Sequence, residues 1–461
     1  MVKLKESMFE EVKLDDALRI LQSRRLGFSQ IRLLPKGDKL RPITNLRRRA
    51  LTRGATKVLG PSINSILGPV HTLLKLEKTL NPSKLGSTMF SVSDMYTRLK
   101  QFKERLGPNH GRLYFAKVDV QAAFDTIPQA AVIKLMGSVP SQAKYTITKH
   151  VEVKPGERAE LQGDKAATKA IRRWQATALP EGDSSCFSKR LETDLGAKKK
   201  NTVFVDSAVQ KTHSVHELLS LLKQHVEQNL VKVGKKYYRQ KMGIPQGSVV
   251  SSFLCNYFYA DLEKKHLGFL AATDTLLLRL IDDFLLITLD RDKATRFVET
   301  MHRGLPEYGV VVNPKKTLVN FDMWCSGGDI YRQRDAGLDI SASLTVDFGR
   351  APGQNFQRKV LNAFKIQSHL MFFDTAHNSA RTVITSLHGT ISKVIDVAFL
   401  LLTSKSRTMR YPQYACGVKK AQVALVACTA FTKVLSKKPA NYGQVMEWLR
   451  MEKERLGSGK Q

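Results

Sequence analysis

Cysteine is scarce in this chain, whose 461 residues include five cysteines, at positions 186, 255, 325, 416 and 428. Their number is odd, and no two of them have the Cys-x-x-Cys spacing that is typical of zinc sites and thiol redox motifs. We therefore expect reduced thiols in an intracellular protein, without a structural zinc ion.

The sequence also lacks an apolar run of the length that crosses a membrane. The first residues, Met1-Val-Lys-Leu-Lys-Glu-Ser7, contain no apolar signal core. The most apolar later stretch runs from Ile391 to Thr403, carries Lys393 and Asp396, and is shorter than the roughly 20 residues of a transmembrane helix. We expect a soluble chain without a membrane partner.

Acidic residues are few relative to basic ones: 41 against 74, for a net charge of +33. Such an excess repels itself in a compact fold, and a polyanionic partner relieves the repulsion. Nucleic acid is the leading expectation, with binding that weakens steeply as salt rises. A ribosome-like or merely basic protein is the alternative, but it leaves the paired carboxylates described next without a role. The length predicts two or more packed lobes.

Two neighbouring carboxylates, Asp282 and Asp283, lie inside the apolar run 276–287. The apolar flanks predict buried β-structure, where an uncompensated carboxylate costs several kcal/mol. A divalent cation such as Mg²⁺ is the usual compensation for oxygen ligands packed this densely. A second predicted strand, 114–124, carries Asp119 near its end. Side by side, the two strands would form the two-metal phosphoryl-transfer centre of a polymerase.

Other segments set the expected organisation. Residues 1–26 have leucines at helical spacing, and residues 28–45 predict a hairpin around Lys36-Gly-Asp-Lys39. The polar, lysine-rich text from about 141 to 236 is too long for a simple connection, so we expect an inserted subdomain there. Beyond residue 350 the chain is predicted to be helical and basic, with apolar faces at 360–373, 383–402 and 421–435.

Five segments, taken in chain order, resemble the motifs of the telomerase reverse transcriptase family. Lys36 to Ile43, with Arg41-Pro-Ile, is similar to the paired fingers motifs, and Phe115-Ala-Lys-Val-Asp-Val-Gln-Ala-Ala-Phe-Asp-Thr-Ile-Pro-Gln129 resembles motif A. Gly243-Ile-Pro-Gln-Gly-Ser248 resembles motif B′, and Leu278-Arg-Leu-Ile-Asp-Asp-Phe-Leu286 resembles motif C. Residues 306–317 resemble motif D. The resemblance extends from about residue 28 to the C-terminus.

Two details favour telomerase over retroviral or mobile-element enzymes. Isoleucine precedes the motif C pair, and the long insert between motifs A and B′ is similar to the family's insertion in fingers. Residues 362–373 resemble the C-terminal thumb extension of fungal members. The sequence also departs from the family's pattern at two points. The chain has no room for N-terminal domains that bind RNA and anchor DNA, which we expect to be absent or to lie outside it. Motif E is altered after Trp324-Cys325.

The resemblance implies an α+β fold of the right-hand polymerase type, with fingers, a palm built on an antiparallel sheet, and a helical thumb. We expect fingers and palm over residues 1–330, including the insertion at about 141–236, and the thumb extension over 331–461. The implied function is RNA-directed DNA synthesis that extends telomeric DNA 3′ ends. The implied partners are telomerase RNA, a single-stranded telomeric DNA primer and dNTPs, and the implied location is the nucleus, at telomeres.

The same resemblance assigns roles to the acidic residues. Asp119 and Asp282 would hold two Mg²⁺ ions, with Asp283 supporting the site and the backbone carbonyl of Val120 as an additional ligand. One ion would lower the pKa of the primer hydroxyl, and the other would neutralise the triphosphate. Apart from the resemblance, Asp125 follows the predicted Asp119 strand and is expected to cap the next helix.

Nucleotide-binding residues are implied in the fingers and beside motif A. Lys36 and Arg41 would clamp the incoming triphosphate, although ordinary exposed cations on a hairpin are the alternative. Phe124 stands five positions after Asp119, where the family places an aromatic sugar gate that clashes with a ribose 2′-hydroxyl. A core aromatic is the alternative for Phe124.

Two further sites are implied downstream. Gln246 would contact the nucleotide or template near the nascent pair, in a turn where Gly243 and Gly247 permit close backbone approach. Lys316 would sit near the leaving pyrophosphate as a general acid, with the neighbouring Lys315 and a solvated lysine as alternatives.

Two other functions stay open from the sequence. One is a polymerase of an intron or retroelement, and the other is a truncated product that binds nucleic acid without extending it. The long insert argues against the first, and the carboxylates of Asp119, Asp282 and Asp283 argue against the second.

Overall fold

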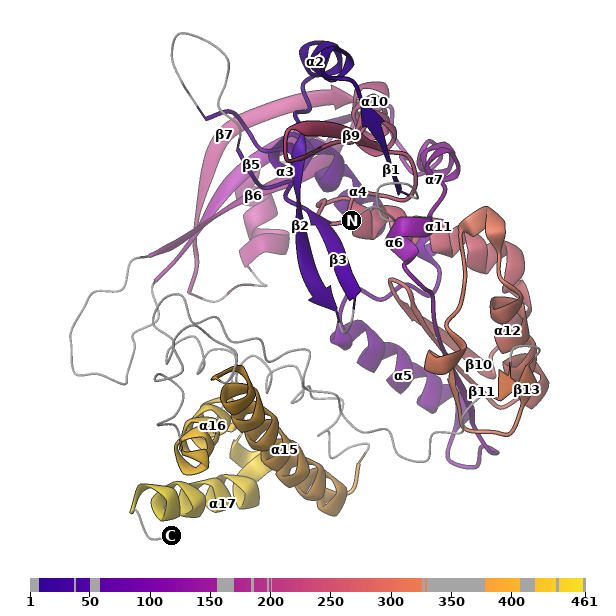
Figure 1. The fold of residues 1–461 in the computed structure, drawn as a ribbon. Coiled ribbons are helices and arrows are strands. Elements are labelled where there is room, and N and C mark those ends of the chain that lie inside the picture. Colours follow the sequence, from indigo (N-terminus) through magenta and orange to yellow (C-terminus); the bar gives the residue numbers. More distant parts are fainter. Residues whose placement is uncertain are drawn as a thin grey trace. The chain divides into compact units, whose positions relative to one another are not determined.

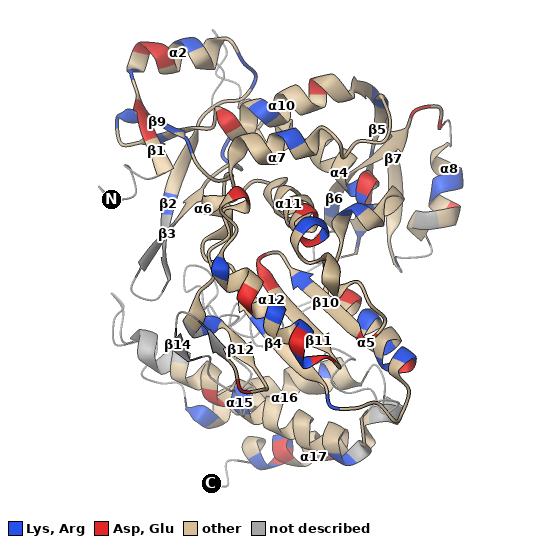
Figure 2. Ribbon diagram, turned by 90° about the vertical axis from the view of Figure 1, so that its right-hand side faces the viewer, with Lys and Arg blue, Asp and Glu red and all other residues tan. Residues whose placement is uncertain are grey.

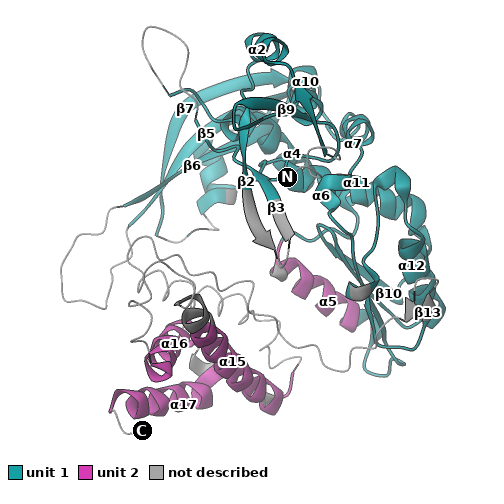
Figure 3. Cartoon of the chain, viewed as in Figure 1, with its two compact units in different colours: residues 1–90, 104–333 teal, residues 91–103, 334–461 magenta. Residues whose placement is uncertain are grey.

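The computed structural model of the chain describes residues 8–36, 39–49, 59–155, 170–183, 186–196, 199, 201–325, 328–329, 378–406, 419–436 and 439–458 (Figure 1). The chain divides into two compact units (Figure 3). The first comprises residues 1–90 and 104–333, and the second comprises 91–103 and 334–461. The predicted domain limits, 1–330 and 331–461, stay a prediction. Lysine and arginine occur on helices and strands throughout both units (Figure 2).

A four-stranded sheet with the order β10-β11-β4-β12 carries the acidic motifs. It consists of β10 (Thr275–Leu280), β11 (Asp283–Thr288), β4 (Tyr114–Asp119) and β12 (Leu318–Val319), all paired antiparallel. Side chains alternate between its faces: Val118 and Phe284 are buried opposite each other, whereas Lys117 points to the other, more open face. The predicted antiparallel sheet is thereby confirmed.

Helices pack around this sheet and complete the core of the first unit. The most deeply buried is α11 (Ser251–His266), which has buried residues on all its sides. The others are α3 (Ile63–Ile66), α4 (Gly68–Leu80), α6 (Ala123–Thr126), α7 (Gln129–Met136) and α12 (Arg291–Arg303). Short 3₁₀ turns connect them at η1 (Pro82–Leu85), η3 (Gly268–Leu270), η4 (Pro306–Tyr308) and η5 (Pro314–Lys316).

A five-stranded sheet with the order β1-β9-β8-β2-β3 carries the fingers motifs. Its strands are β1 (Phe9–Val12), β9 (Lys236–Gln240), β8 (Leu230–Val233), β2 (Ser29–Lys36) and β3 (Lys39–Thr44). The β2–β3 hairpin confirms the two predicted strands, and the turn between them lies outside the described residues.

The helix predicted for residues 1–26 is wrong in part. Phe9–Val12 forms β1 instead, and only α2 (Leu14–Gln22) is helical, while residues 1–7 lie outside the described residues. The cause is tertiary: β1 pairs with β9, and Phe9 packs in a small cluster with Val231 and Tyr238. Local helical spacing carries no information about that distant partner strand.

The predicted insertion contains a sheet that the sequence analysis missed. Its strands are β5 (Lys144–Lys154), β6 (Ile171–Pro180) and β7 (Val203–Ser214), in the order β6-β5-β7. Between β6 and β7 lie α8 (Phe187–Arg190) and the π-helical turn η2 (Leu191–Leu195). The helix that follows them is α10 (Val215–Glu227), which begins with the Ser214 hydroxyl accepting a hydrogen bond from the Glu217 amide.

The second unit is helical in the part that the structure describes. It includes most of α5 (Val92–Leu106) together with α15 (Ala380–Ser406), α16 (Lys420–Leu435) and α17 (Pro439–Gly457). Helices α15 and α16 confirm the predicted faces at 383–402 and 421–435. The predicted face at 360–373 lies outside the described residues. Residues Arg381–Leu400 are, by length and composition, also apolar enough to cross a membrane, over a longer span than the sequence analysis recognised. One side of α15 packs against α16 and α17.

Candidate catalytic site

Three acidic residues, Asp119, Asp282 and Asp283, lie at one end of the β10–β11–β4 sheet. Asp119, the last residue of β4, pairs in register with Asp283, the first residue of β11. The Val120 amide donates a hydrogen bond to the Asp282 carbonyl at 3.1 Å, which fixes the adjacent turn against the same strand. The structure therefore brings the predicted acidic residues together, from segments more than 160 positions apart in the sequence.

The prediction that the acidic pair is buried is wrong. Asp282 lies in the turn between β10 and β11, and the Asp283 side chain is 41% exposed. Asp119 is better shielded, with 17% of its side chain exposed. The apolar residues around the pair belong to the bodies of two strands, whereas the pair lies where the hairpin turns toward solvent. Water and bound cations can therefore reach these carboxylates.

The turn itself has an unusual backbone. Leu280 pairs with Asp283, which leaves a two-residue turn of Ile281 and Asp282, and Ile281 has a φ of 60°. A β-branched residue is a steric outlier in this left-handed region, and such strain persists only where surrounding contacts hold it. The hydrogen bond from Val120 to Asp282 is one of those contacts.

Two lysines pair with the site carboxylates. The Lys316 Nζ lies 2.8 Å from Asp119 Oδ2, and the Lys117 Nζ lies 3.4 Å from Asp283 Oδ1. Lys316 lies at the end of η5, while the side chain of Lys315 lies outside the described residues. Lys117 was missed, although its position two residues before Asp119 on a strand places both on one face.

The residues at this edge suit a divalent cation by their chemistry. Within the described ranges, no three His, Cys, Asp or Glu side chains are gathered closely enough to hold a metal ion. The carboxylates of Asp119, Asp282 and Asp283 and the Val120 carbonyl are nonetheless hard oxygen donors of the kind that Mg²⁺ prefers. The ammonium groups of Lys316 and Lys117 lie against two of these carboxylates, so the edge already attracts cations.

The glycine-rich loop 243–248 joins the fingers to the segment after β4. The Gln246 side-chain amide donates to Asp125 Oδ1 at 2.7 Å, and the Gln246 carbonyl accepts from the Thr44 amide at 2.9 Å. The Ile244 amide donates to the Phe124 carbonyl at 2.7 Å. Gln246 and Phe124, predicted to be near the nucleotide, thus belong to one hydrogen-bonded assembly.

Asp125 does not cap the next helix as expected. The residue before α7 is Pro128, which has no side-chain capping hydrogen bond, and Asp125 lies within the short helix α6. Its carboxylate accepts the hydrogen bond from Gln246 instead. The partner comes from another part of the chain, so the local sequence did not indicate it.

The loop depends on its two glycines. Gly243 has a φ of 72°, and a Cβ there would lie 2.5 Å from the Phe124 carbonyl oxygen. Gly247 has a φ of 104°, and a Cβ there would lie 2.5 Å from the Thr44 carbonyl oxygen. At both positions the positive φ and the short Cβ distance exclude a larger residue unless the backbone moves, in agreement with the predicted close backbone approach.

The remaining predicted residues are placed less completely. Phe124 is partly buried and packs against the main core, so the structure leaves both the sugar-gate and the core reading open. Lys36 and Arg41 lie on the paired strands β2 and β3, but their side chains lie outside the described residues.

A buried histidine supports the loop and was missed by the sequence analysis. His225 of α10 is 2% exposed, and its Nε2 lies 2.9 Å from the Ser248 hydroxyl. Burial, together with the positive charge of Arg24, lowers the pKa of His225 to about 3. The imidazole is therefore neutral at physiological pH.

We expect His225 to make the fold acid-sensitive. As the pH falls below 6.5, the ordinary pKa of histidine, the unfolded chain binds a proton that the folded chain binds only near pH 3, so stability falls across this window. His225→Gln, which still reaches Ser248 but does not titrate, should lose less stability than wild type between about pH 7 and about pH 5. Urea unfolding at both pH values measures this loss, with the exposed His110→Gln as control. Equal losses in wild type and His225→Gln would contradict the assignment.

Comparison with known proteins identifies relatives of one kind. Residues 196–335 match the family model described as reverse transcriptase (RNA-dependent DNA polymerase). The chain is 28% identical to telomerase reverse transcriptase of Mus musculus over 84% of its length, and 30% identical to that of Canis lupus familiaris over 78%. It spans only 36% and 34% of the length of these two relatives.

The fold has a counterpart among solved structures. A structure of telomerase from Candida albicans, in complex with a TWJ fragment of telomeric RNA, matches 97% of this chain and 69% of that one, with a TM-score of 0.54 at 16% identity. The likeness confirms the predicted α+β polymerase fold. The chain is thus a homologue of the telomerase reverse transcriptases over most of its length, and it contains a reverse transcriptase domain.

Proposed function

We propose that this chain is an RNA-directed DNA polymerase of the telomerase type, which extends telomeric DNA 3′ ends by copying an RNA template. The observation that carries the proposal is the register of β4 and β11, which sets Asp119 opposite Asp283 and Val120 against Asp282. Paired acidic strand ends on an open sheet edge suit the electrostatic demands of phosphoryl transfer. The homology to telomerase reverse transcriptases supports the same activity.

The metal proposal follows from the donor set. Asp119 and Asp282 would hold two Mg²⁺ ions, with Asp283 and the Val120 carbonyl supporting them. When bound, the ions would make the primer 3′-hydroxyl more acidic and neutralise charge on the triphosphate. The exposed edge leaves the carboxylates accessible, and both paired lysines have substantially exposed side chains, so their ion pairs can open at little cost.

The chain's other residues would bind, orient and protonate the substrate. Lys36 and Arg41, on the β2–β3 hairpin, would hold the triphosphate of the incoming nucleotide. The hydrogen bond between Gln246 and Asp125 would orient Gln246 and the backbone of Gly247 toward the nascent pair. Lys316, already beside Asp119, would donate a proton to the leaving pyrophosphate.

The partners follow from charge and homology. A net charge of +33 suits a polyanionic ligand, and the Candida telomerase binds a fragment of telomeric RNA. We therefore propose telomerase RNA, a single-stranded telomeric primer and dNTPs as the partners of this chain, acting in the nucleus at telomeres.

Primer extension on a preformed RNA–DNA hybrid, with Mg²⁺ and dNTPs, tests the proposal. We expect the DNA primer to be extended along the RNA template, and we expect extension to stop when EDTA removes the metal. Hybrid binding without extension would overturn the proposed activity and favour a protein that binds nucleic acid without copying it.

Phe124→Ala is expected to weaken discrimination against ribonucleotides. Removing the ring would remove the clash with the 2′-hydroxyl, so the dNTP-to-rNTP ratio of kcat/KM should fall by at least about tenfold, which corresponds to about 1.4 kcal/mol. Single-nucleotide incorporation with matched dNTP and rNTP pairs measures this ratio. Phe124→Tyr keeps the ring and should keep the ratio. An unchanged ratio in Phe124→Ala would leave Phe124 as a core aromatic.

A further inference from the structure

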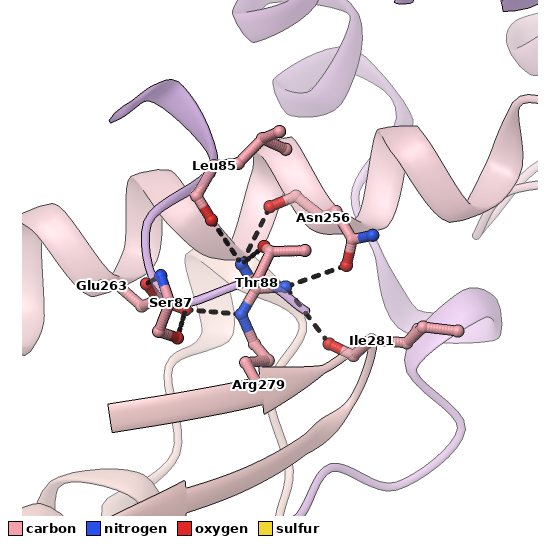
Figure 4. A network of polar contacts seen from close by, with 7 residues as sticks. All are labelled: Leu85, Ser87, Thr88, Asn256, Glu263, Arg279 and Ile281. Carbon is pink, nitrogen blue, oxygen red and sulfur yellow. Dashed lines mark hydrogen bonds and ion pairs between the residues drawn. The ribbon is translucent and has the colours of Figure 1, made fainter. Parts of the chain in front are cut away.

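Arg279, on β10, is the largest fully buried side chain among the described residues, with no exposed surface. It lies on the closed face of the sheet, where its register partner is the equally buried Phe284. A buried guanidinium requires compensation for each of its N–H groups. The contacts that supply it connect three separate parts of the first unit (Figure 4).

The first connection is to helix α11. The Arg279 Nε donates to Glu263 Oε1, Nη1 donates to Asn256 Oδ1 at 3.0 Å, and Nη2 donates to the Asn256 carbonyl at 3.0 Å. Glu263 and Asn256 are both buried on α11, two turns apart. The guanidinium therefore fixes β10 along the axis of that helix.

The second connection is to the segment 85–89. The Arg279 Nη2 donates to Thr88 Oγ1, and the backbone of Arg279 accepts from the Met89 amide at 2.7 Å. Ser87 donates to Glu263 through both its amide and its hydroxyl, at 2.7 Å each. A Cβ on Gly86 would lie 2.2 Å from Glu263 Oε2, so the segment is shaped around this carboxylate.

The third connection is to the turn that carries the acidic pair. The Arg279 Nη1 also donates to the Ile281 carbonyl at 3.4 Å. Ile281 is the residue with a φ of 60°, and Asp282, which follows it, is held on its other side by the Val120 amide. The guanidinium thus supplies a contact that holds the strained turn one residue before Asp282 (Figure 4).

A gain in folding stability does not by itself explain why Arg279 and Glu263 form a buried ion pair. Burying two charges incurs a desolvation penalty that can exceed their attraction, and a well-packed apolar pair is often as stable. The position of the pair is more informative, since it joins α11 and the segment 85–89 to the turn before Asp282. We propose that Arg279 is a positioning residue, which sets the backbone of the β10–β11 turn so that Asp282 and Asp283 present their carboxylates for metal binding. This inference rests on the proposed polymerase function.

Arg279→Lys tests the inference, because lysine keeps the charge but lacks the planar fork that reaches several acceptors. We expect the kcat for extension on the full chain to fall about 100-fold, the effect of a small displacement in a catalytic constellation, with little change in the KM for dNTPs. Mn²⁺ binding, followed by electron paramagnetic resonance, should weaken. Amide exchange in a peptide that contains Val120 should become faster.

Glu77→Gln is the matched control. Glu77 is a fully buried carboxylate of the same unit, and it accepts hydrogen bonds from Tyr145, Ser141 and Asn81. Its loss should lower thermal stability without changing Mn²⁺ binding or exchange at Val120. If Arg279→Lys behaves like Glu77→Gln, the role of Arg279 is structural and the inference is overturned.

A double variant, Arg279→Met with Glu263→Met, separates folding from positioning. Replacing both charges leaves neither charge buried alone, so the double variant should melt at a higher temperature than Arg279→Met alone, while kcat stays low and exchange at Val120 stays fast. Recovery of kcat together with stability would overturn the inference. A wild-type chain that does not extend primers would overturn the proposed function instead, and Mn²⁺ binding and Val120 exchange would still decide the role of Arg279.

Discussion

The Asp119→Asn variant is expected to extend primers at least about a thousandfold more slowly than wild type, because metal-based charge stabilisation is worth several kcal/mol. Asparagine keeps the size of the side chain but removes the negative charge at the point where β4 and β11 meet. Single-turnover extension of a preformed hybrid in Mg²⁺ measures the change. Hybrid affinity should stay the same or rise slightly, since one negative charge is removed from a surface that binds a polyanion.

Asp206→Asn provides the control for the charge change. Asp206 is exposed on β7, where its carboxylate accepts a hydrogen bond from the Ala208 amide at 3.2 Å. Its removal should leave the rate of extension unchanged. Extension at the wild-type rate by Asp119→Asn would remove Asp119 from the proposed metal site, whereas loss of hybrid binding would show that the residue supports the fold.

The sequence predicted which acidic residues lie side by side, but it did not predict that they are exposed to solvent. The apolar flanks indicated the strands, and two strands with acidic residues near their ends indicated a shared edge, which the pairing of Asp119 with Asp283 confirms. The same apolar residues led to the wrong expectation of burial. Those apolar residues belong to the bodies of β10 and β11, whereas Ile281 and Asp282 form the turn between the two strands.

Long-range partners account for most of what the sequence did not reveal. Arg279 stands in an apolar run, and nothing local indicates that its charge is matched by Glu263, 16 positions earlier on a helix. The same holds for His225 beside Ser248 and for β1, whose partner strand lies more than 220 residues away. Tertiary pairing decides these features, and local propensity does not describe it.

The residue pattern alone predicted an acidic, metal-binding edge of a sheet. The resemblance to a known family was needed to predict the function. The chain is homologous to telomerase reverse transcriptases over most of its length, and its fold has a counterpart in a solved telomerase structure. These likenesses leave individual roles as proposals, most clearly for Lys36 and Arg41, whose side chains lie outside the described residues. Experiments on the loop 243–248 are more direct, because its backbone contacts are defined.

Gly243→Ala is expected to disrupt the contact between the loop 243–248 and helix α6. Its φ of 72° is costly for alanine, and the new Cβ would lie 2.5 Å from the Phe124 carbonyl and 2.7 Å from the Asp125 Cα. Backbone strain of this kind costs about 1–3 kcal/mol, and the clash forces the loop away in addition. The variant should lose most extension activity and unfold at lower urea concentration than wild type.

Gly234→Ala separates strain from displacement. Gly234 lies in the β8–β9 turn with a φ of 61°, but a Cβ there would have nothing within 4 Å. It should therefore show the strain cost alone, about 1 kcal/mol, and keep its activity. If the two substitutions have equal effects on urea unfolding and on extension, backbone strain accounts for the effect of Gly243→Ala, and the close approach of Gly243 to Phe124 does not. A larger loss of extension activity in Gly243→Ala than in Gly234→Ala would show that activity requires the loop to lie against α6. Of these two substitutions, Gly243→Ala places its methyl group against a neighbouring backbone, and Gly234→Ala does not.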